Sequence, residues 1–527
     1  MATDPIPSRR AIDSIGRGTV FMVLGTFALF LLTFVGRILV ARRLPPELFG
    51  DFNLGLALAG LLSLVALLGL HQAVARTLGE HRDPATRRRV IRWAAAITSM
   101  MAFGSSIAVY LLATPIAEIF DPAEASNLTS VFQLFSVTVG VTLVCTFIAS
   151  VFQGFEDTVP NAWINQAVQP GAFVVFVYVF FAFHLQLEGA LIAWVLSNLV
   201  TLSALLIYAW RRLPLHLPPG PSAHELPSGM LVLSLALWGV TTLTFVTLYI
   251  DTLILGHYRP ESQVGIYSAV MLLARLVLVG SASMTYIFLP VTARLVGEKD
   301  YATIRSSFVT TSRWVLLLTL PMFFDFVFLP NDSIQLVFGR AYLSGDLALV
   351  LIATAALVSV AFGPVNVTLA GMAMTRPLLL ATAISAGTNV VLSFALTPTY
   401  GLMGAAIAWS VARVLYPATG AAALYSDHRI TPLRPTLVRP LLVTLAVGIP
   451  TFVVIGFVPH PDWVVIPLFF FAAGLFLASI LVTRSVEEGD MIVCRILERM
   501  IGRPLPKLQR FLLRFSSPAS ADTVPMP

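Results

Sequence analysis

Long apolar stretches of similar length alternate with short polar or Pro- and Gly-rich segments along the whole chain. A membrane-spanning helix needs about 20 mostly apolar residues, and fourteen stretches meet this requirement. They fall near residues 17–41, 50–74, 91–113, 128–152, 161–183, 188–210, 229–255, 264–290, 308–330, 347–370, 377–397, 402–425, 438–458 and 464–483. No stretch shows the period-two alternation of a membrane strand, and lipid does not tolerate irregular backbone. The pattern therefore predicts an all-α polytopic membrane protein with about 14 transmembrane helices.

The composition supports this prediction. Hydrophobic residues make up 57% of the 527 positions and charged residues only 11%. Soluble domains carry roughly 45–50% apolar and about 25% charged residues. Too little polar surface remains here to cover a water-soluble globule.

Several motifs of soluble enzymes are missing from the sequence. It contains neither a Gly-rich loop with a lysine that would hold nucleotide phosphates nor a His/Cys cluster that would hold a metal. A membrane-embedded glycosyltransferase would share the composition, but it should carry a large acidic outer loop, and the outer loops are short. We therefore expect a transporter and not an enzyme, with no cofactor and no nucleic-acid partner.

The basic residues indicate an orientation. With the N-terminus inside, 25 of the 33 lysines and arginines fall in cytoplasmic segments or the tail, and only Arg42, Arg43, Arg259 and Arg340 fall outside. Cytoplasmic loops of membrane proteins carry this excess. The first apolar stretch runs on to Val40 without a small-residue cleavage pattern, so we interpret it as a retained span. We expect a multi-pass protein of the plasma (inner) membrane with both termini cytoplasmic.

The chain repeats itself after about 215 residues, which corresponds to six stretches. The matched motifs are GDF (50–52) and GIY (265–267), ARTLGE (75–80) and ARLVGE (293–298), and GALIAW (189–194) and GAAIAW (404–409). Because six is an even number, both copies enter the membrane in the same sense. This predicts two six-helix lobes in a parallel pseudo-repeat, with a cavity between them.

The repeat and the composition together predict a division of the chain into six segments. These are a cytoplasmic N-terminus (1–16), an N-lobe (17–212), a Pro-rich cytoplasmic linker (213–228), a C-lobe (229–425), two C-terminal spans (438–484) and an amphipathic basic tail (485–527). We expect the tail to lie on the anionic cytoplasmic leaflet.

Three stretches of sequence resemble a known family. The stretch GRILVARRLPPELFG at residues 36–50 is similar to the segment between spans 1 and 2 of the polysaccharide-biosynthesis flippases (Wzx type). The stretches YIDTLILG at 249–256 and VGIYSA at 264–269 are similar to its second-lobe counterpart. These flippases belong to the multidrug/oligosaccharidyl-lipid/polysaccharide (MOP) exporter superfamily. The resemblance extends over roughly residues 10–485.

The resemblance implies an architecture and a substrate. It implies two lobes in a V that open alternately to each face, and it implies flipping of polyprenyl-phosphate- or pyrophosphate-linked oligosaccharides from the cytoplasmic to the outer face. The partners it implies are this lipid-linked oligosaccharide, membrane lipids, and a glycan polymerase or glycosyltransferases. Spans 13 and 14 favour a lipid-linked glycan over a drug, because multidrug extruders of the superfamily usually stop at twelve spans.

Two other transport functions remain open. A lipid-linked peptidoglycan precursor flippase is compatible with fourteen spans. A cation-coupled multidrug exporter, similar to the multidrug and toxin extruders (MATE), would want an acidic residue inside the first six spans. The sequence places no acidic residue in the interior of these spans.

Six charged residues stand out within the predicted spans, away from the first two residues at either end, where each charge costs about 2.5–3.5 kcal/mol on insertion scales. They are Arg37, Asp251, Arg275, Arg313, Asp325 and Arg413. Arg275 and Arg413 lie near the midplane, and a guanidinium fork matches phosphate oxygens. We hypothesise that these two arginines, with Arg37, bind the lipid phosphate; the alternative is that they form ion pairs between helices. Asp251, Asp325 and Arg313 are candidates for ion coupling or for such ion pairs.

Intramembrane amides are the remaining candidates for substrate contact. Asn198 occupies in span 6 the position that Arg413 occupies in span 12. Asn165 in span 5 and Asn389 in span 11 are similar polar groups. Each would contact either sugar hydroxyls or a neighbouring helix, since hydrogen bonding between helices is a common role of such residues.

Overall fold

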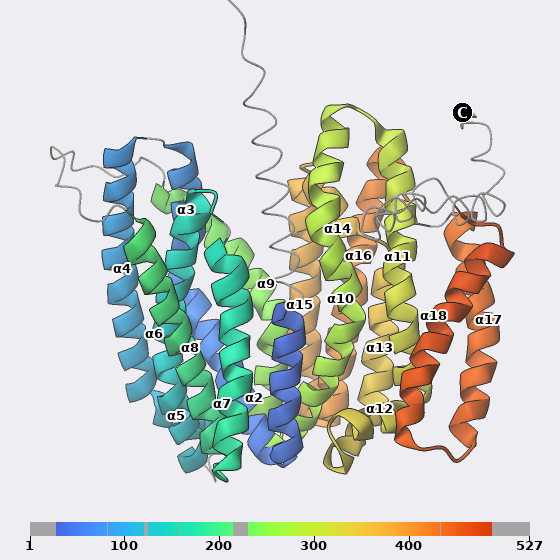
Figure 1. Cartoon of the computed structure of the whole chain (residues 1–527), viewed down its shortest axis with the longest axis horizontal. Helices are drawn as coiled ribbons and strands as arrows, with labels where there is room; N and C mark the ends of the chain where they lie inside the picture. Colours follow the sequence, from blue (N-terminus) through green and yellow to red (C-terminus); the bar gives the residue numbers. More distant parts are fainter. Residues whose placement is uncertain are drawn as a thin grey trace, which may run out of the picture. The chain divides into compact units, whose positions relative to one another are not determined.

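The computed structural model describes residues 28–81, 83–120, 125–157, 159–213, 230–432 and 434–486. The predicted N-terminal segment, most of the linker between the lobes and almost all of the basic tail lie outside these residues. The described chain is built from helices (Figure 1).

The first described helix runs through residues 28–43 and carries no label in Figure 1. The labelled elements follow in chain order: α2 (Pro46–Leu67), α3 (Leu70–Glu80), α4 (Pro84–Leu111), α5 (Ala113–Phe120), α6 (Ala125–Gly154), η1 (Pro160–Val168), α7 (Gln169–Ala182), α8 (Leu187–Arg212), α9 (Met230–Tyr258), α10 (Glu261–Gly297), α11 (Tyr301–Phe328), α12 (Pro330–Val337), η2 (Arg340–Gly345), α13 (Asp346–Ala361), α14 (Val365–Gly371), α15 (Thr375–Tyr400), α16 (Leu402–His428), α17 (Pro435–Phe457), η3 (Asp462–Val464) and α18 (Val465–Val482).

The helices account for the predicted spans. Among the described residues, 11 helical segments are long and apolar enough to cross a membrane. The helix through residues 28–43, α9 and α16 supply the three predicted spans that remain. The prediction of an all-α polytopic membrane protein with about fourteen transmembrane helices is confirmed.

Proline marks the start of several spans. Pro46, Pro84 and Pro435 occupy the first turns of α2, α4 and α17. The first helical N–H groups have no partner within the helix, so the missing N–H of proline costs nothing there, and its fixed φ suits the helix. These three helices therefore begin a few residues earlier than the apolar stretches do.

The two repeats use the same cap at the equivalent turns before α4 and α11. Asp83 precedes α4 and accepts hydrogen bonds from the backbone N–H and the hydroxyl of Thr86, both at 2.8 Å. Asp300 precedes α11 and accepts the same two bonds from Thr303, at 3.0 and 2.5 Å. These bonds satisfy helix N–H groups that have no partner within the helix. The hydrogen bonds from the threonines hold the pKa of each aspartate below its ordinary value.

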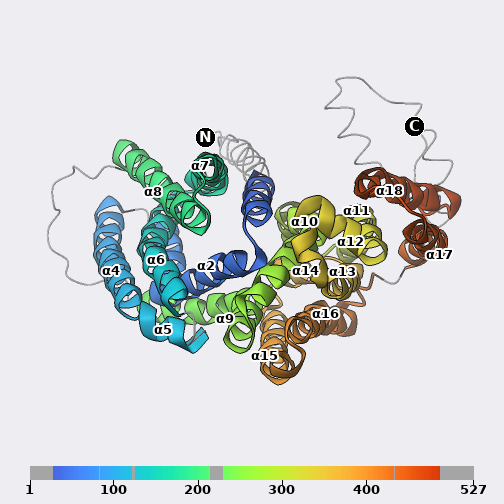
Figure 2. The same cartoon turned by 90° about the horizontal axis from the view of Figure 1, so that it is seen from below.

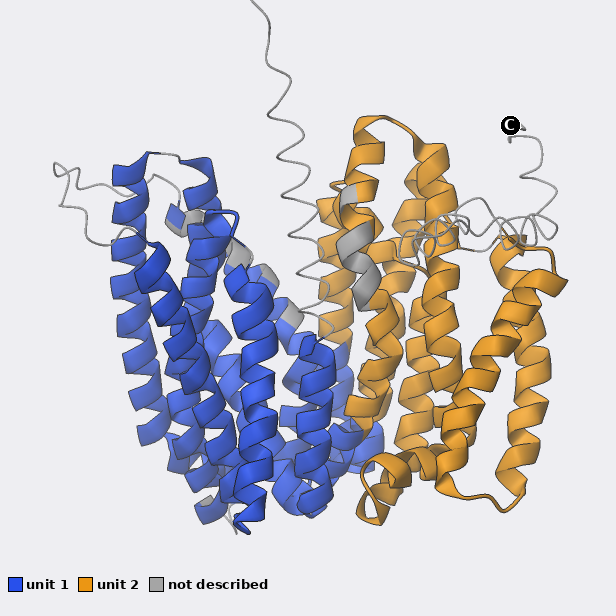
Figure 3. Cartoon of the chain, viewed as in Figure 1, with its two compact units in different colours: residues 1–269, 389–405 blue, residues 270–388, 406–527 orange. Residues whose placement is uncertain are grey.

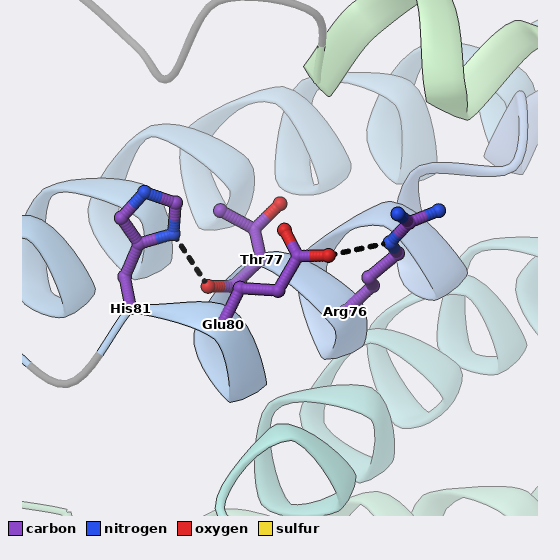
Figure 4. A network of polar contacts seen from close by, with 4 residues as sticks. All are labelled: Arg76, Thr77, Glu80 and His81. Carbon is purple, nitrogen blue, oxygen red and sulfur yellow. Dashed lines mark hydrogen bonds and ion pairs between the residues drawn. The ribbon is translucent and has the colours of Figure 1, made fainter.

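The matched ARTLGE and ARLVGE motifs also end in the same way. In α3, Nε of Arg76 lies 2.7 Å from Oε1 of Glu80 (Figure 4), and in α10 Nε of Arg294 lies 4.0 Å from Oε1 of Glu298. Both pairs join residues four apart, which face each other on a helix. The residue after α3 is a histidine, and its ring Nδ1 lies 3.1 Å from the carbonyl oxygen of Thr77 (Figure 4).

The chain forms two compact units (Figure 3). Unit 1 contains residues 1–269 and 389–405, and unit 2 contains residues 270–388 and 406–527. Unit 1 thus includes α9, the start of α10 and the turn between α15 and α16, all of which belong to the second sequence repeat. The units divide the chain differently from the predicted lobes, which stay a prediction based on the repeat.

In unit 1, α6 is the central helix and contacts α2, α3, α4, α5 and α8 (Figure 2). Its buried Phe152 joins Val74 of α3 and Val90 of α4 in one apolar cluster. Elsewhere in the unit, the ring of Phe52 in α2 stacks on that of Phe173 in α7, at 6.2 Å between centroids. Lipid is as apolar as these side chains, so close packing holds the helices together here.

Helix α9 of the second repeat packs along α2 and α3 of the first. A Cβ atom added to Gly256 would overlap the side chain of Leu54, and one added to Gly60 would lie 2.7 Å from the ring of Phe245. Small residues therefore bring α2 and α9 into close contact within unit 1.

In unit 2, α11 contacts α12, α13, α17 and α18. The rings of Phe324 in α11 and Phe452 in α17 stack at 4.9 Å between centroids, and Gly448 leaves the space that the Phe324 ring fills. Phe476 of α18 is buried in the same cluster. Spans 13 and 14, which lie outside the sequence repeat, are thus packed on span 9.

Three predicted spans are interrupted helices. Span 2 breaks between α2 and α3 at Leu68 and Gly69, which have φ of 46° and 70°. Span 10 breaks between α13 and α14 at Gly363, with φ of 81°, followed by Pro364. Span 5 opens with a nine-residue π-helix (η1) before it continues as α7. Interrupted helices in membrane proteins line cavities or pack against protein, because lipid cannot satisfy their backbone groups.

Candidate functional site

Arg413 lies on α16, eleven residues after the helix begins at Leu402. It is half-buried, and Pro417, Gly420 and Leu424 on the same side of the helix are buried. Its Nε atom is buried without a hydrogen-bond partner, and no hydrogen bond or ion pair reaches the guanidinium from any residue that the structure describes. A charge in this condition is costly in a membrane, so Arg413 is the strongest candidate for binding an anion.

The other two arginines of the hypothesised phosphate site are in a different condition. Arg275 on α10 and Arg37 on the first helix are both half-buried. Each already interacts with other residues of the protein. Next to Arg37, Gly36 packs against the ring of Phe173. Unlike Arg413, these two arginines therefore already have interaction partners within the protein.

Arg313 is placed as a structural residue. It is 2% exposed on α11, and its Nη1 donates a hydrogen bond to the carbonyl oxygen of Ser485, just after α18. This bond ties span 9 to the end of span 14. Of the two roles considered for Arg313, the geometry favours holding helices together.

Asp251 on α9 is 0% exposed and accepts a hydrogen bond from the hydroxyl of Tyr267 on α10. Tyr267 is also 0% exposed. The pair joins the two helices on either side of the turn at residues 259 and 260. A hydrogen bond of this kind stabilises a buried carboxylate, which would otherwise be expensive to bury.

Asp325 on α11 is 2% exposed, and its Oδ1 finds no hydrogen-bond partner among the described residues. Arg313 lies on the same helix twelve residues earlier, which corresponds to about 18 Å along the axis. These two residues therefore do not pair with each other. The neighbouring side chains Phe324 and Phe328 are aromatic and stack at 6.0 Å between centroids.

Two of the three amides are hydrogen-bonded within their own helices. Asn198 is 9% exposed, and its Nδ2 donates to the carbonyl oxygen of Trp194 at 2.8 Å. Asn165 lies in the π-helix and its Nδ2 is 3.4 Å from Oδ1 of Asn161. Short π-helical segments often occur at functional sites. The π-helix is therefore an additional reason to consider Asn165 a candidate for substrate contact.

Asn389 belongs to a buried polar stripe on α15. Ser385, Asn389, Ser393 and Thr397 recur every four residues and are at most 2% exposed. The hydroxyl of Ser385 donates to the carbonyl oxygen of Ala412 on α16 at 2.9 Å. Asn389 itself accepts a hydrogen bond from the hydroxyl of Ser393 on its own helix at 3.4 Å, and its Nδ2 has no partner among the described residues. Both roles considered for Asn389 therefore stay predictions.

The sequence analysis did not single out one buried acidic residue near the start of span 2. It placed the start of span 2 at residue 50, but α2 begins at Pro46, so Asp51 lies more than one turn inside the helix. Asp51 is 5% exposed. Asp51 is thus a buried acid in the first turns of span 2, and the expectation about the interior of the first six spans stays a prediction. The signal was the Pro45-Pro46 pair, which marks the helix start.

The structure divides the candidate residues between the two units. Unit 1 holds Arg37, Asp51, Asn165, Asn198, Asp251 and Asn389, and unit 2 holds Arg275, Arg313, Asp325 and Arg413. Among the described residues, no group of three or more His, Cys, Asp and Glu side chains is arranged to hold a metal ion.

The fold and the buried charges define a class of protein, a polytopic membrane transporter. The model of the polysaccharide biosynthesis protein family matches residues 15–296, more than half of the chain. The chain belongs to this family. No curated protein matches it.

Solved structures share the fold over most of the chain. A multidrug resistance MATE family transporter of the MOP superfamily, in an inward-facing conformation, has a TM-score of 0.64 at 16% identity and covers 76% of this chain and 96% of its own. The lipid II flippase MurJ, in an inward closed conformation, has a TM-score of 0.64 at 13% identity, covering 90% and 100%. The MATE multidrug transporter DinF-BH has a TM-score of 0.58 at 14% identity, covering 82% and 98%. These neighbours are transporters and flippases, and at such identities they establish the fold.

Proposed function

We propose that this protein flips a polyprenyl-phosphate- or pyrophosphate-linked oligosaccharide from the cytoplasmic to the outer face of the membrane by alternating access. The observation that carries the proposal is Arg413, a guanidinium inside span 12 with no partner among the described residues. A lipid phosphate would supply the missing acceptor oxygens, and guanidinium–phosphate pairs are among the strongest polar contacts in proteins. Membership of the polysaccharide biosynthesis family supports a glycan as the cargo.

The lipid-linked cargo also fits the composition of the membrane part. A polyprenyl chain stays in the bilayer while the sugar crosses, so only the phosphate and the hydroxyls need polar groups along the path. Arg413, which no described residue pairs with, is such a group for the phosphate. We also propose that the protein lies in the plasma membrane with both termini on the cytoplasmic side. Glycan polymerases or glycosyltransferases would then act beside it in the assembly of the polysaccharide.

The test is reconstitution of the full chain in vesicles that contain a fluorescent polyprenyl-pyrophosphate-linked sugar. We expect the wild-type protein to expose the sugar of inner-leaflet molecules to an added quencher. Arg413→Ala should slow this exposure about 10- to 100-fold, the equivalent of losing a hydrogen-bonded charge worth about 1.5–3 kcal/mol. Arg413→Lys should fall in between, because an ammonium lacks the planar fork.

Arg340→Ala is the matched control, since Arg340 is an exposed arginine in the outer helix η2. It should flip the lipid at the wild-type rate. Wild-type activity in Arg413→Ala would contradict the proposal.

A second candidate function is cation-coupled export of drugs, and Asp51 is the observation that favours it. A buried carboxylate in the first six spans is the feature that this function requires, and α2 provides it. If this function holds, Asp51→Asn should abolish dye efflux driven by an imposed proton or sodium gradient. The same vesicles should then show no flipping of the lipid-linked sugar.

A further inference from the structure

Three amide side chains follow one another along the first half of span 5. Asn161 and Asn165 lie in the π-helix η1, and Gln169 is the first residue of α7. Side chains four residues apart are neighbours on a helix, and Nδ2 of Asn165 lies 3.4 Å from Oδ1 of Asn161. All three side chains are half-buried. We call Asn161, Asn165 and Gln169 the amide ladder.

The amide ladder is turned toward span 6. Helix α7 packs along α8 (Figure 2), and Nε2 of Gln169 donates to the hydroxyl of Ser197 on α8 at 3.4 Å. Trp163 is 45% exposed and lies two positions from both asparagines, which places it on nearly the opposite side of η1. Because lipid offers amides no hydrogen bonds, the side of the helix that suits lipid is that of Trp163 and not that of the ladder.

The amide ladder has hydrogen-bonding capacity to spare. Each amide can donate two hydrogen bonds and accept two. The described residues supply the ladder with one bond between Asn165 and Asn161 and one between Gln169 and Ser197, both at 3.4 Å. Ordinary N–H···O bonds are about 2.9–3.0 Å long. A ligand can therefore complete the bonding that the protein leaves open.

An indole N–H beside the ladder is in a similar condition. The ring of Trp194 on α8 packs edge-on against Phe173, one turn beyond Gln169, at 5.0 Å between centroids. Nε1 of Trp194 is buried and has no hydrogen-bond partner among the described residues. Ser197 also donates to the carbonyl oxygen of Trp194 at 2.7 Å. The open donor and the ladder thus lie on the same two spans, connected through Ser197 and Phe173.

The chemistry of these groups fits a neutral ligand that carries hydroxyl groups. Amides offer donors and acceptors side by side, and a hydroxyl group uses both. An anion would meet the amide oxygens unfavourably, and no charged residue occurs in η1 or α7. The charged residues of α8 lie at its two ends. An apolar ligand would leave all these polar groups without partners.

We propose that the amide ladder and the N–H of Trp194 bind the sugar hydroxyls of the cargo. The inference rests on the proposed function, because the sugar is the hydroxyl-bearing part of a lipid-linked oligosaccharide. The ladder and Trp194 belong to unit 1, whereas Arg413 belongs to unit 2. The groups for the sugar and for the phosphate are thus separate, and each can be removed without the other.

The experiment compares two lipids that differ in hydroxyl groups. The purified full chain is titrated with a short polyprenyl phosphate that carries glucose, and with the same lipid carrying a cyclohexyl group. We expect the wild type to bind the glucose lipid about 10-fold more tightly or better, since each hydrogen bond contributes about 3- to 10-fold. The double variant Asn165→Leu with Gln169→Leu should lose most of this preference. Trp194→Phe keeps an aromatic ring and should reduce the preference about 3-fold.

Gln153→Leu is the matched control, because Gln153 is an exposed amide near the end of α6. It should keep the wild-type preference for glucose. Thermal unfolding without lipid shows separately what each substitution does to the fold. If the ladder only holds η1 on α8, Asn165→Leu lowers the unfolding midpoint and leaves the preference unchanged, and that result would overturn the proposal.

Arg413→Gln separates this inference from the proposed role of Arg413. It should weaken binding of both lipids by the same factor and keep the preference for glucose. Unchanged binding of both lipids by Arg413→Gln would reject the phosphate role and keep the ladder. Equal binding of the two lipids by the wild type, with both weakened in Arg413→Gln, would reject the ladder and keep the phosphate role.

Discussion

The two sequence repeats are alike at the turns before α4 and α11 and unlike inside their spans. Asp83 and Asp300 cap equivalent helices through equivalent threonines. Inside the membrane, Asn198 of the first repeat is replaced by Arg413 in the second, and an aromatic Phe by a Tyr at positions 52 and 267. The helix interruptions also differ, because the first repeat is interrupted in spans 2 and 5 and the second in span 10.

This difference separates two tasks. The caps and ion pairs lie at the turns that lead from one span to the next, and they occur in both repeats. The proposed function accounts for the asymmetry of the buried charges, because a cargo that carries its phosphate at one end would need a charged partner in one repeat only. Variants that make the two repeats more alike test whether this asymmetry matters for transport and stability.

The largest effect should come from the pair Asn198 and Arg413. Replacing Arg413 by Asn, the residue of the first repeat, should reduce flipping about 10- to 100-fold, because the phosphate loses its charged partner. Asn198→Ala should change flipping little, because Asn198 is bonded to its own helix. Flipping in vesicles measures both. Equal losses of flipping in the two variants would show that Asn198 and Arg413 contribute equally to transport.

The next largest effect should come from the two helix breaks. Gly69→Ala should lower the free energy of unfolding by about 2–4 kcal/mol, since alanine at positive φ is strained and its Cβ would overlap the backbone oxygen of Ser234. Gly363→Ala should cost about 1–2 kcal/mol, because its Cβ meets side chains of Ser312 and Phe308, which can move. Thermal unfolding in detergent ranks the two, and a larger loss for Gly363→Ala would contradict the structure.

Much of the fold could be predicted from the sequence, and the errors have physical causes. Hydropathy located all the spans because a bilayer leaves no other choice of structure. Asp51 was missed because an apolar stretch marks the hydrophobic core and not the helix start, which the proline of α2 sets. The hydrogen bond of Arg313 to Ser485 could not be predicted from the sequence, because it joins residues 172 positions apart that only the packing of the helices brings together. That Arg413 has no partner among the described residues is likewise a property of the packing.

The difference between Tyr267 and Phe52 should give a smaller effect. Tyr267→Phe removes the donor to Asp251 and should destabilise the protein by about 1–3 kcal/mol, the usual cost of leaving a buried polar group unsatisfied. Tyr258→Phe is the control, because Tyr258 is exposed at the end of α9. Thermal unfolding checks both variants, and indistinguishable midpoints would show that the Tyr267 hydroxyl contributes nothing.

The smallest effect should come from the shared caps. Because the pKa of Asp83 and of Asp300 is lowered in the folded protein, each ionised carboxylate stabilises it above the ordinary carboxyl pKa. This contribution is lost as the pH falls through the lowered pKa. Asp83→Asn and Asp300→Asn should therefore flatten the acid limb of the stability profile slightly and by equal amounts. A clear difference between the two would show that the caps are not equivalent.

The proposed function depends above all on Arg413 binding the charged head of the cargo, and this binding can be measured on the purified protein. The protein is titrated with a short polyprenyl-phosphate-linked sugar and with the same sugar on a neutral polyprenol. We predict that Arg413→Gln weakens binding of the phosphate lipid about 10-fold or more and leaves binding of the neutral lipid unchanged. Equal affinity of the wild type and Arg413→Gln for the phosphate lipid would refute this role of Arg413.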